Sequence, residues 1–218
     1  MKLIRPCRTG FAVAALAALL CGSAAADELV QLPEPAKEGG MPLMEALANR
    51  KSIRTYQSKP IPPETLSNLL WAAWGVNRPD GRRTAPSTRN LQCVEIYVVL
   101  EEGLFAYDAE EHALRRVLDE DVREKTGPPR FTEHAPLHLV YVADFDRLEP
   151  LREEVREVYA WADTSFISQN VYLFCASEGL ATVVRSVRPD PLAEALGLPE
   201  NKRPILAQTI GFPVEEEE

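Results

Sequence analysis

A short basic segment holds the clearest candidate for binding chemistry in the sequence. The run Asn49-Arg50-Lys51-Ser52-Ile53-Arg54 places three cations and a hydroxyl close together. Arginine can hold a phosphate through two parallel hydrogen bonds, lysine adds a point charge, and serine adds a donor. Basic residues also stabilise the negative end of a helix dipole. The segment is therefore either an anion site or the solvated end of a helix.

A second polar segment covers residues 82–92, Arg-Arg-Thr-Ala-Pro-Ser-Thr-Arg-Asn-Leu-Gln. Asn90 and Gln92 each carry donors and an acceptor, which suits binding to the polar edge of a heterocycle. Polar side chains of this kind also stabilise turns at the entrance of a strand. Both interpretations remain open from composition alone.

Common catalytic signatures are missing from the sequence. It contains no G-x-S-x-G, no G-x-G-x-x-G, no phosphate-binding P-loop and no C-x-x-C pattern. His134 and His138 are four residues apart, but Pro136 between them and the β-prone run from Leu137 argue against one helix carrying both as metal ligands. We assign no catalytic acid, no catalytic base and no metal ligand.

Helices are expected where apolar residues recur at helical spacing. Met41–Asn49 is a short candidate, and Pro62-Pro63 opens a second whose apolar residues run from Leu66 to Trp74. Residues 152–179 are expected to be mostly helical, in one or two pieces. Weaker patterns predict helix over 119–125, and a short helix over 191–196 closed by Gly197.

Strands are expected where β-branched and aromatic residues cluster. The strongest candidates are 94–100, 137–142 and 205–210, and a hairpin is expected from 104–107 and 112–117. A loop is expected from Pro128. Intermixed strands and helices predict an α+β or mixed α/β class.

Composition excludes several classes of protein. The 218 residues carry a formal net charge of −9, which argues against a general nucleic-acid binder. Apolar residues make up 45% of the chain, too many for a wholly disordered protein. Beyond the N-terminal region, no run is apolar for the roughly 18 residues that a membrane span requires.

The first 26 residues have the order of a secretory signal peptide. A basic start precedes a short apolar run and then Ala24-Ala25-Ala26, a small-residue cleavage site. We therefore expect an exported protein, with the periplasm as its compartment. The expected organisation is a signal peptide over 1–26, an extended N-terminal arm over 27–40, a domain over 41–214 and an acidic tail over 215–218.

Four cysteines bear on that compartment. Cys7 and Cys21 leave with the signal peptide, unless Cys21 carries a lipid. Cys93 and Cys175 remain, and they either form a disulfide in an oxidising compartment or stay as buried thiols.

Together, the two polar segments resemble the nitroreductase family of flavin enzymes. The family pattern R-(K/R)-S-x-R is present as Arg50 to Arg54, and P-S-x-x-N-x-Q is present as Pro86 to Gln92. Similar stretches also occur at 69–78, 167–170, 179–182 and 211–213. The resemblance spans about residues 41–213 and is strongest to the branch similar to the dehydrogenases of thiazole and oxazole peptide maturation.

The resemblance implies a three-layer α+β fold, with a central, mainly antiparallel sheet flanked by helices. It also implies an intertwined homodimer that binds FMN at the subunit interface. Arg50, Lys51, Ser52 and Arg54 match positions that hold the flavin phosphate and ribityl chain, and Asn90 matches a position at the edge of the isoalloxazine. Val184, Arg185 and Ser186 match the segment whose backbone approaches the ring.

The activity implied is that of an FMN-dependent oxidoreductase, which passes electrons from a reduced donor to a small acceptor such as a nitroaromatic or a quinone. In such enzymes the flavin carries the hydride chemistry and the protein positions it. The family also places basic residues near its C-terminus, where this chain has Glu215 to Glu218; Arg185 and Arg188 are candidates to replace them. The alternative is a non-catalytic exported module that keeps the fold and binds a ligand or a protein partner.

Overall fold

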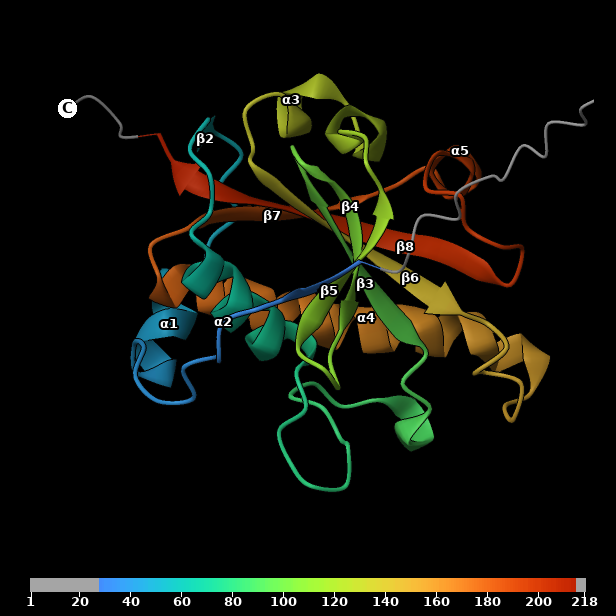
Figure 1. The fold of residues 1–218 in the computed structure, drawn as a ribbon. Helices are drawn as coiled ribbons and strands as arrows, with labels where there is room; N and C mark the ends of the chain where they lie inside the picture. Colours follow the sequence, from blue (N-terminus) through green and yellow to red (C-terminus); the bar gives the residue numbers. More distant parts are fainter. Residues whose placement is uncertain (1–27, 215–218) are drawn as a thin grey trace, which may run out of the picture.

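The computed structural model describes residues 28–214 (Figure 1). The expected signal peptide and acidic tail therefore lie outside the described residues. Within the described part, no helix is long and apolar enough to cross a membrane.

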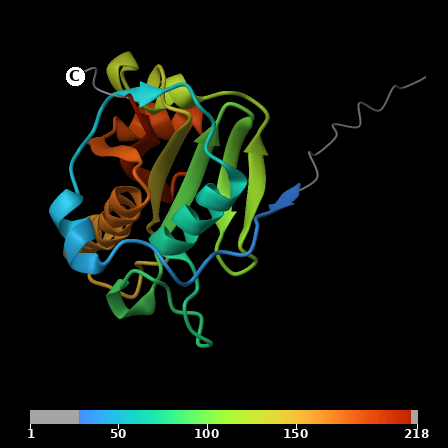
Figure 2. The same cartoon turned by 90° about the vertical axis from the view of Figure 1, so that its left-hand side faces the viewer.

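A β-sheet with strands of different lengths forms the centre of the molecule, and every described pair of neighbouring strands is antiparallel. Its eight described strands are β1 (Leu29–Gln31), β2 (Tyr56–Gln57), β3 (Val94–Leu100), β4 (Gly103–Asp108), β5 (Ala113–Leu118), β6 (Leu137–Asp144), β7 (Ala181–Ser186) and β8 (Lys202–Pro213). The order is β1-β5-β4-β3-β6-β8-β2, and β7 also pairs with β8. The extended N-terminal arm thus contributes β1, which pairs with β5 at the edge of the sheet (Figure 2).

Helices cover both faces of this sheet. On one face lie α1 (Leu43–Asn49), α2 (Pro63–Trp74) and the long α4 (Glu153–Ser177), drawn below the sheet in Figure 1. Above it lie the short α3 (Pro129–Thr132) and α5 (Pro189–Ala195). Two 3-10 turns complete the described elements, η1 (Thr88–Asn90) and η2 (Arg123–Thr126).

Strand alternation separates the two larger of three hydrophobic clusters among the described residues, because successive side chains point to opposite faces of a sheet. Ile96 and Leu139 belong to the core shared with α2 and α4, where they join buried Leu70 and Ile167. The next residue of each strand points to the other face, so Val140, which follows Leu139, belongs to the second core with residues of α5. The expected three-layer α+β fold with a mainly antiparallel sheet is confirmed.

Several local features differ from the expectations. Residues 181–186 form β7, a strand that the sequence analysis does not predict. Pro129 occupies the first turn of α3 inside an expected loop, where its missing N–H costs nothing. The helix expected over 119–125 is reduced to the 3-10 turn η2.

The open question about the two remaining cysteines is answered by their environments. Cys93 and Cys175 are both free and fully buried. Burial raises the pKa of the Cys93 thiol to about 12, with the nearby Asp163 carboxylate acting in the same direction. Burial also raises the pKa of the Cys175 thiol, so both side chains are protonated at neutral pH.

Candidate functional site

The basic turn, defined here as residues 50–54, follows the end of α1 and lies against the edge of β7. The N–H of Arg50 closes α1 by donating to the Ala46 carbonyl at 3.0 Å. The N–H of Ile53 then donates to the Thr182 carbonyl at 3.0 Å. These backbone contacts place the basic turn between the helical layer and the open edge of β7.

Tyr172 joins the basic turn to both α4 and β7. Its hydroxyl lies 2.9 Å from Ser52 Oγ, and it accepts the N–H of Val184 at 3.0 Å. When the Tyr172 proton is donated to Ser52 Oγ, the proton of Ser52 is left to bind an anion. The arrangement holds the serine next to the segment matched to the flavin ring.

The cations of the basic turn have no acidic partner among the described residues. Arg50 lies over the Tyr172 ring, with its Cζ 5.3 Å from the ring centroid. Arg54 makes one long hydrogen bond of 3.5 Å to the Ser52 carbonyl, and Lys51 is exposed. Three unneutralised cations and a serine hydroxyl in one turn are a donor set that fits a phosphate group.

Arg185 lies away from the basic turn. Its side chain is buried on the α5 side of the sheet, where its guanidinium bonds to Thr126, to Thr209 Oγ1 at 3.1 Å and to His138 Nδ1 at 3.2 Å. Burial lowers the pKa of Arg185 to about 10. This arginine therefore reaches the edge of β7 only through its backbone, beside half-buried Val184 and exposed Ser186.

The Asn90 turn, defined here as residues 87–92, has an unusual backbone. Arg89, Asn90 and Gln92 have φ values of 50°, 57° and 49°, in the left-handed region that residues other than glycine seldom adopt. Such strain persists only when surrounding contacts enforce it, and it is frequent at functional sites.

Asp163 on α4 provides those contacts. Its carboxylate accepts hydrogen bonds from Ser87 Oγ at 3.0 Å, from the N–H of Thr88 at 3.1 Å and from Thr88 Oγ1 at 2.9 Å. The N–H of Gln92 in turn donates to Ser87 Oγ at 2.8 Å. The buried carboxylate thus fixes the start of the turn that presents Asn90.

The structure brings the two predicted segments to one helix but not into contact. Asp163 and Tyr172 are nine residues apart on α4, or about 14 Å along its axis. Asn90 is exposed, and its Oδ1 accepts the Gln92 side-chain amide at 3.1 Å. Within one chain, Asn90 and the basic turn therefore lie at different positions along α4 and do not form one site.

Sequence reasoning missed Tyr172 and Asp163. A signal was present for both, because each falls on the buried side of α4 with Ile167 and Val171. A polar side chain at a core position of a helix needs a buried partner.

Among the described residues, no group of three or more His, Cys, Asp or Glu side chains could hold a metal ion.

The chain is similar to known proteins over most of its length. The family model described as "Nitroreductase family" matches residues 47–212. The candidate nitroreductase MJ1384 of Methanocaldococcus jannaschii is 32% identical in an alignment of 197 positions, which covers 85% of this chain and 97% of that protein. An NAD(P)H-dependent FMN reductase of Bacillus subtilis is 26% identical, over 79% of this chain and 66% of that protein.

Solved structures of nitroreductase-like proteins are also similar to this chain. The crystal structure of a candidate nitroreductase from Ralstonia eutropha has 43% identity and a TM-score of 0.83, covering 86% of this chain and 90% of its own. The Escherichia coli microcin synthetase McbBCD, solved with truncated pro-MccB17, shares the fold at 19% identity and a TM-score of 0.66, over 95% of this chain and 85% of its own. The chain belongs to the nitroreductase family and is a flavin-type oxidoreductase of that family.

Proposed function

We propose that the chain binds FMN and passes electrons from a reduced donor to a small acceptor, such as a nitroaromatic or a quinone. The observation that carries this proposal is the basic turn, whose cations lack acidic partners and whose Ser52 is tied through Tyr172 to the edge of β7. That turn matches the family positions for the flavin phosphate. The name of the Bacillus subtilis relative, an FMN reductase, supports the choice of FMN.

The residues of this chain have binding roles in the proposed site. Arg50, Lys51 and Arg54 hold the phosphate through charge-assisted hydrogen bonds, and Ser52 adds a neutral donor. The backbone of Val184 to Ser186 borders the ring, and Asn90 bonds to its polar edge. Bound FMN supplies the electron transfer, and no residue is assigned as a catalytic acid or base.

The experiment uses the purified protein loaded with FMN. The flavin is reduced under anaerobic conditions and mixed with a quinone or a nitroaromatic, while flavin absorbance is followed. We expect rapid reoxidation that depends on the acceptor. Bound FMN that these acceptors do not oxidise would contradict the proposed activity, and absence of bound FMN would favour a non-catalytic module.

We also propose a homodimer with FMN at the subunit interface. Large apolar side chains are exposed on both α1 and α4, which pack together: Leu43, Met44, Leu47, Val158, Trp161 and Phe166. An exposed apolar surface of this kind is typical of an interface. Light scattering is expected to give the mass of a dimer. Phe166→Asp should dissociate it, whereas Val117→Asp, at an exposed site on β5, should not.

Export to the periplasm is proposed from the order of residues 1–26. Cell fractionation of the full chain is expected to recover the protein in the periplasm, and deletion of 1–26 should leave it in the cytoplasm. Recovery of both forms in the cytoplasm would contradict export.

A further inference from the structure

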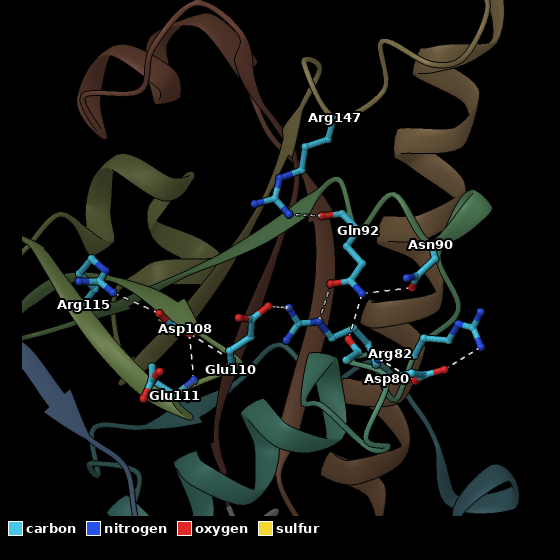
Figure 3. A network of polar contacts seen from close by, with 11 residues as sticks. Asp80, Arg82, Asn90, Gln92, Asp108, Glu110, Glu111, Arg115 and Arg147 are labelled. Atoms are coloured by element: carbon cyan, nitrogen blue, oxygen red, sulfur yellow. Dashed lines mark hydrogen bonds and ion pairs between the residues drawn. The ribbon is translucent and has the colours of Figure 1, made fainter.

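A cavity of about 500 Å³ lies apart from the basic turn, next to the Asn90 turn. Its walls come from the end of α2, the loop before β3, strands β3 to β5, and the single residues Arg147 and Lys202. None of residues 50–54 lines it. The contacts around it are drawn in Figure 3.

Arg83 is the buried cation of this cavity. Its side chain is only 9% exposed, and its Nε donates to Gln92 Oε1 at 2.9 Å. Its Nη1 makes no hydrogen bond to any described residue, and its Nη2 lies 3.7 Å from Glu110 Oε1, beyond hydrogen-bond distance. Burial lowers the pKa of Arg83, and the Glu110 carboxylate acts in the opposite direction. A buried guanidinium with unused donors is costly, so the site favours an anion.

Arg147 approaches the same cavity from the other side of Gln92. Its Nη1 donates to the Gln92 carbonyl at 3.1 Å (Figure 3). Its Nε lies 3.6 Å from the Asp144 carboxylate. The side chain remains 48% exposed. Two guanidinium groups thus meet at Gln92, one at its side chain and one at its backbone.

The other charges of the cavity largely neutralise one another. Lys202 pairs with Glu95 at 2.7 Å, and Arg115 pairs with Asp108 at 3.1 Å. Glu110 is the acidic side chain nearest to the Arg83 guanidinium, but it is 77% exposed. A weak, solvated contact of that kind stabilises little and is easily displaced.

We propose that this cavity binds the phosphate or carboxylate group of a small organic molecule, with Arg83 and Arg147 as donors and with Glu110 displaced by the ligand. Arginine suits both groups, because its planar fork matches two oxygens of either anion. The volume exceeds what a bare ion needs and lies in the range of small-molecule pockets. Trp74, Tyr97 and Val117 offer apolar surface for the rest of the molecule. The site does not depend on FMN.

Titration calorimetry with inorganic phosphate and with malonate tests the proposal, at constant ionic strength set with chloride. An Arg50→Ala background weakens the competing phosphate site in the basic turn. Arg83→Gln and Arg147→Gln should each weaken anion binding by about tenfold or more. Glu110→Gln should strengthen it. Arg82→Gln is the matched control, because Arg82 is 54% exposed, pairs with Asp80 and does not line the cavity.

Comparison of the two probes identifies the anion, since tighter phosphate binding indicates a phosphate ligand and tighter malonate binding a carboxylate. The proposal is overturned if neither probe binds, or if Arg82→Gln reduces binding as much as Arg83→Gln. If circular dichroism shows that Arg83→Gln does not fold, anion binding by Arg147→Gln and Glu110→Gln tests the proposal instead. Unchanged binding in both would then overturn it, and failure of FMN to bind has no bearing on these outcomes.

Discussion

The hydroxyl groups of Ser52 and Tyr172 lie 2.9 Å apart, although the two residues are 120 positions apart in the chain. The same tyrosine oxygen accepts the N–H of Val184. One side chain of α4 therefore connects the basic turn, which fits a phosphate, to the strand edge matched to the flavin ring.

Removing the Tyr172 hydroxyl should loosen both ends of this connection. Tyr172→Phe leaves the Val184 N–H without its partner, so we expect the free energy of unfolding to fall by about 1–3 kcal/mol. Urea denaturation measures this loss. Tyr159→Phe, at an exposed position on the same helix, is the control and should be nearly neutral. Equal effects of the two variants would contradict a specific role for the Tyr172 hydroxyl.

Arg50→Ala tests the phosphate assignment. A charge-assisted hydrogen bond contributes about 1.5–3 kcal/mol, so FMN should bind about tenfold to a hundredfold more weakly. Riboflavin lacks the phosphate and should lose much less. Lys37→Ala, in the N-terminal arm, is the control for a lost surface charge. If FMN and riboflavin lose affinity equally, Arg50 supports the structure instead of binding phosphate.

Asp163→Asn tests the anchor of the Asn90 turn. The amide cannot accept all the hydrogen bonds that Ser87 and Thr88 donate to the carboxylate, and its own N–H groups face those donors. We expect a loss of about 2 kcal/mol or more in the free energy of unfolding, measured by chemical denaturation. Glu154→Gln, an exposed acid on the same helix, should have little effect. An Asp163→Asn variant as stable as the wild type would show that the Asn90 turn keeps its backbone conformation without the Asp163 carboxylate.

The sequence located both polar segments because their chemically distinctive residues are close together in the chain. Their partners could not be found in that way, since Asp163 and Tyr172 are brought to them only by the packing of α4. Helical spacing identifies which side of α4 is buried, but it does not identify what that side contacts.

The side chain of Arg185 could not be placed from the sequence. The family resemblance concerns the backbone of its segment, but β7 is not predicted as a strand, and alternation along a strand turns the side chains of Val184 and Arg185 to opposite faces. The six residues of β7 follow a long helix, and Thr182 and Arg185 among them are both buried. The segment therefore lacks the simple alternation of polar and apolar side chains that would predict a strand.

Acid should weaken the fold through His138. Burial lowers the pKa of this histidine to about 3, and Arg185 and Arg123 act in the same direction. An unfolded histidine has a pKa of about 6.5, so between these values the unfolded chain binds a proton that the folded chain does not. The free energy of unfolding should therefore fall as the pH drops below about 6.5, by up to about 1.4 kcal/mol per pH unit.

Denaturation at pH 7 and pH 5 measures this effect before most carboxylates titrate. The pKa of His112 is also lowered by burial and adds a loss of the same sign. His138→Gln should lose less stability than the wild type between the two pH values, and the exposed His134→Gln should behave like the wild type. Equal losses in the wild type and His138→Gln would contradict the assignment.

Titration of the purified protein with FMN tests the central claim most directly. Flavin absorbance and fluorescence report binding, and equilibrium dialysis gives the stoichiometry. We predict one FMN per chain, with saturation at micromolar FMN. No binding at micromolar FMN would contradict the account, because the unneutralised cations of the basic turn would then have no flavin phosphate to hold.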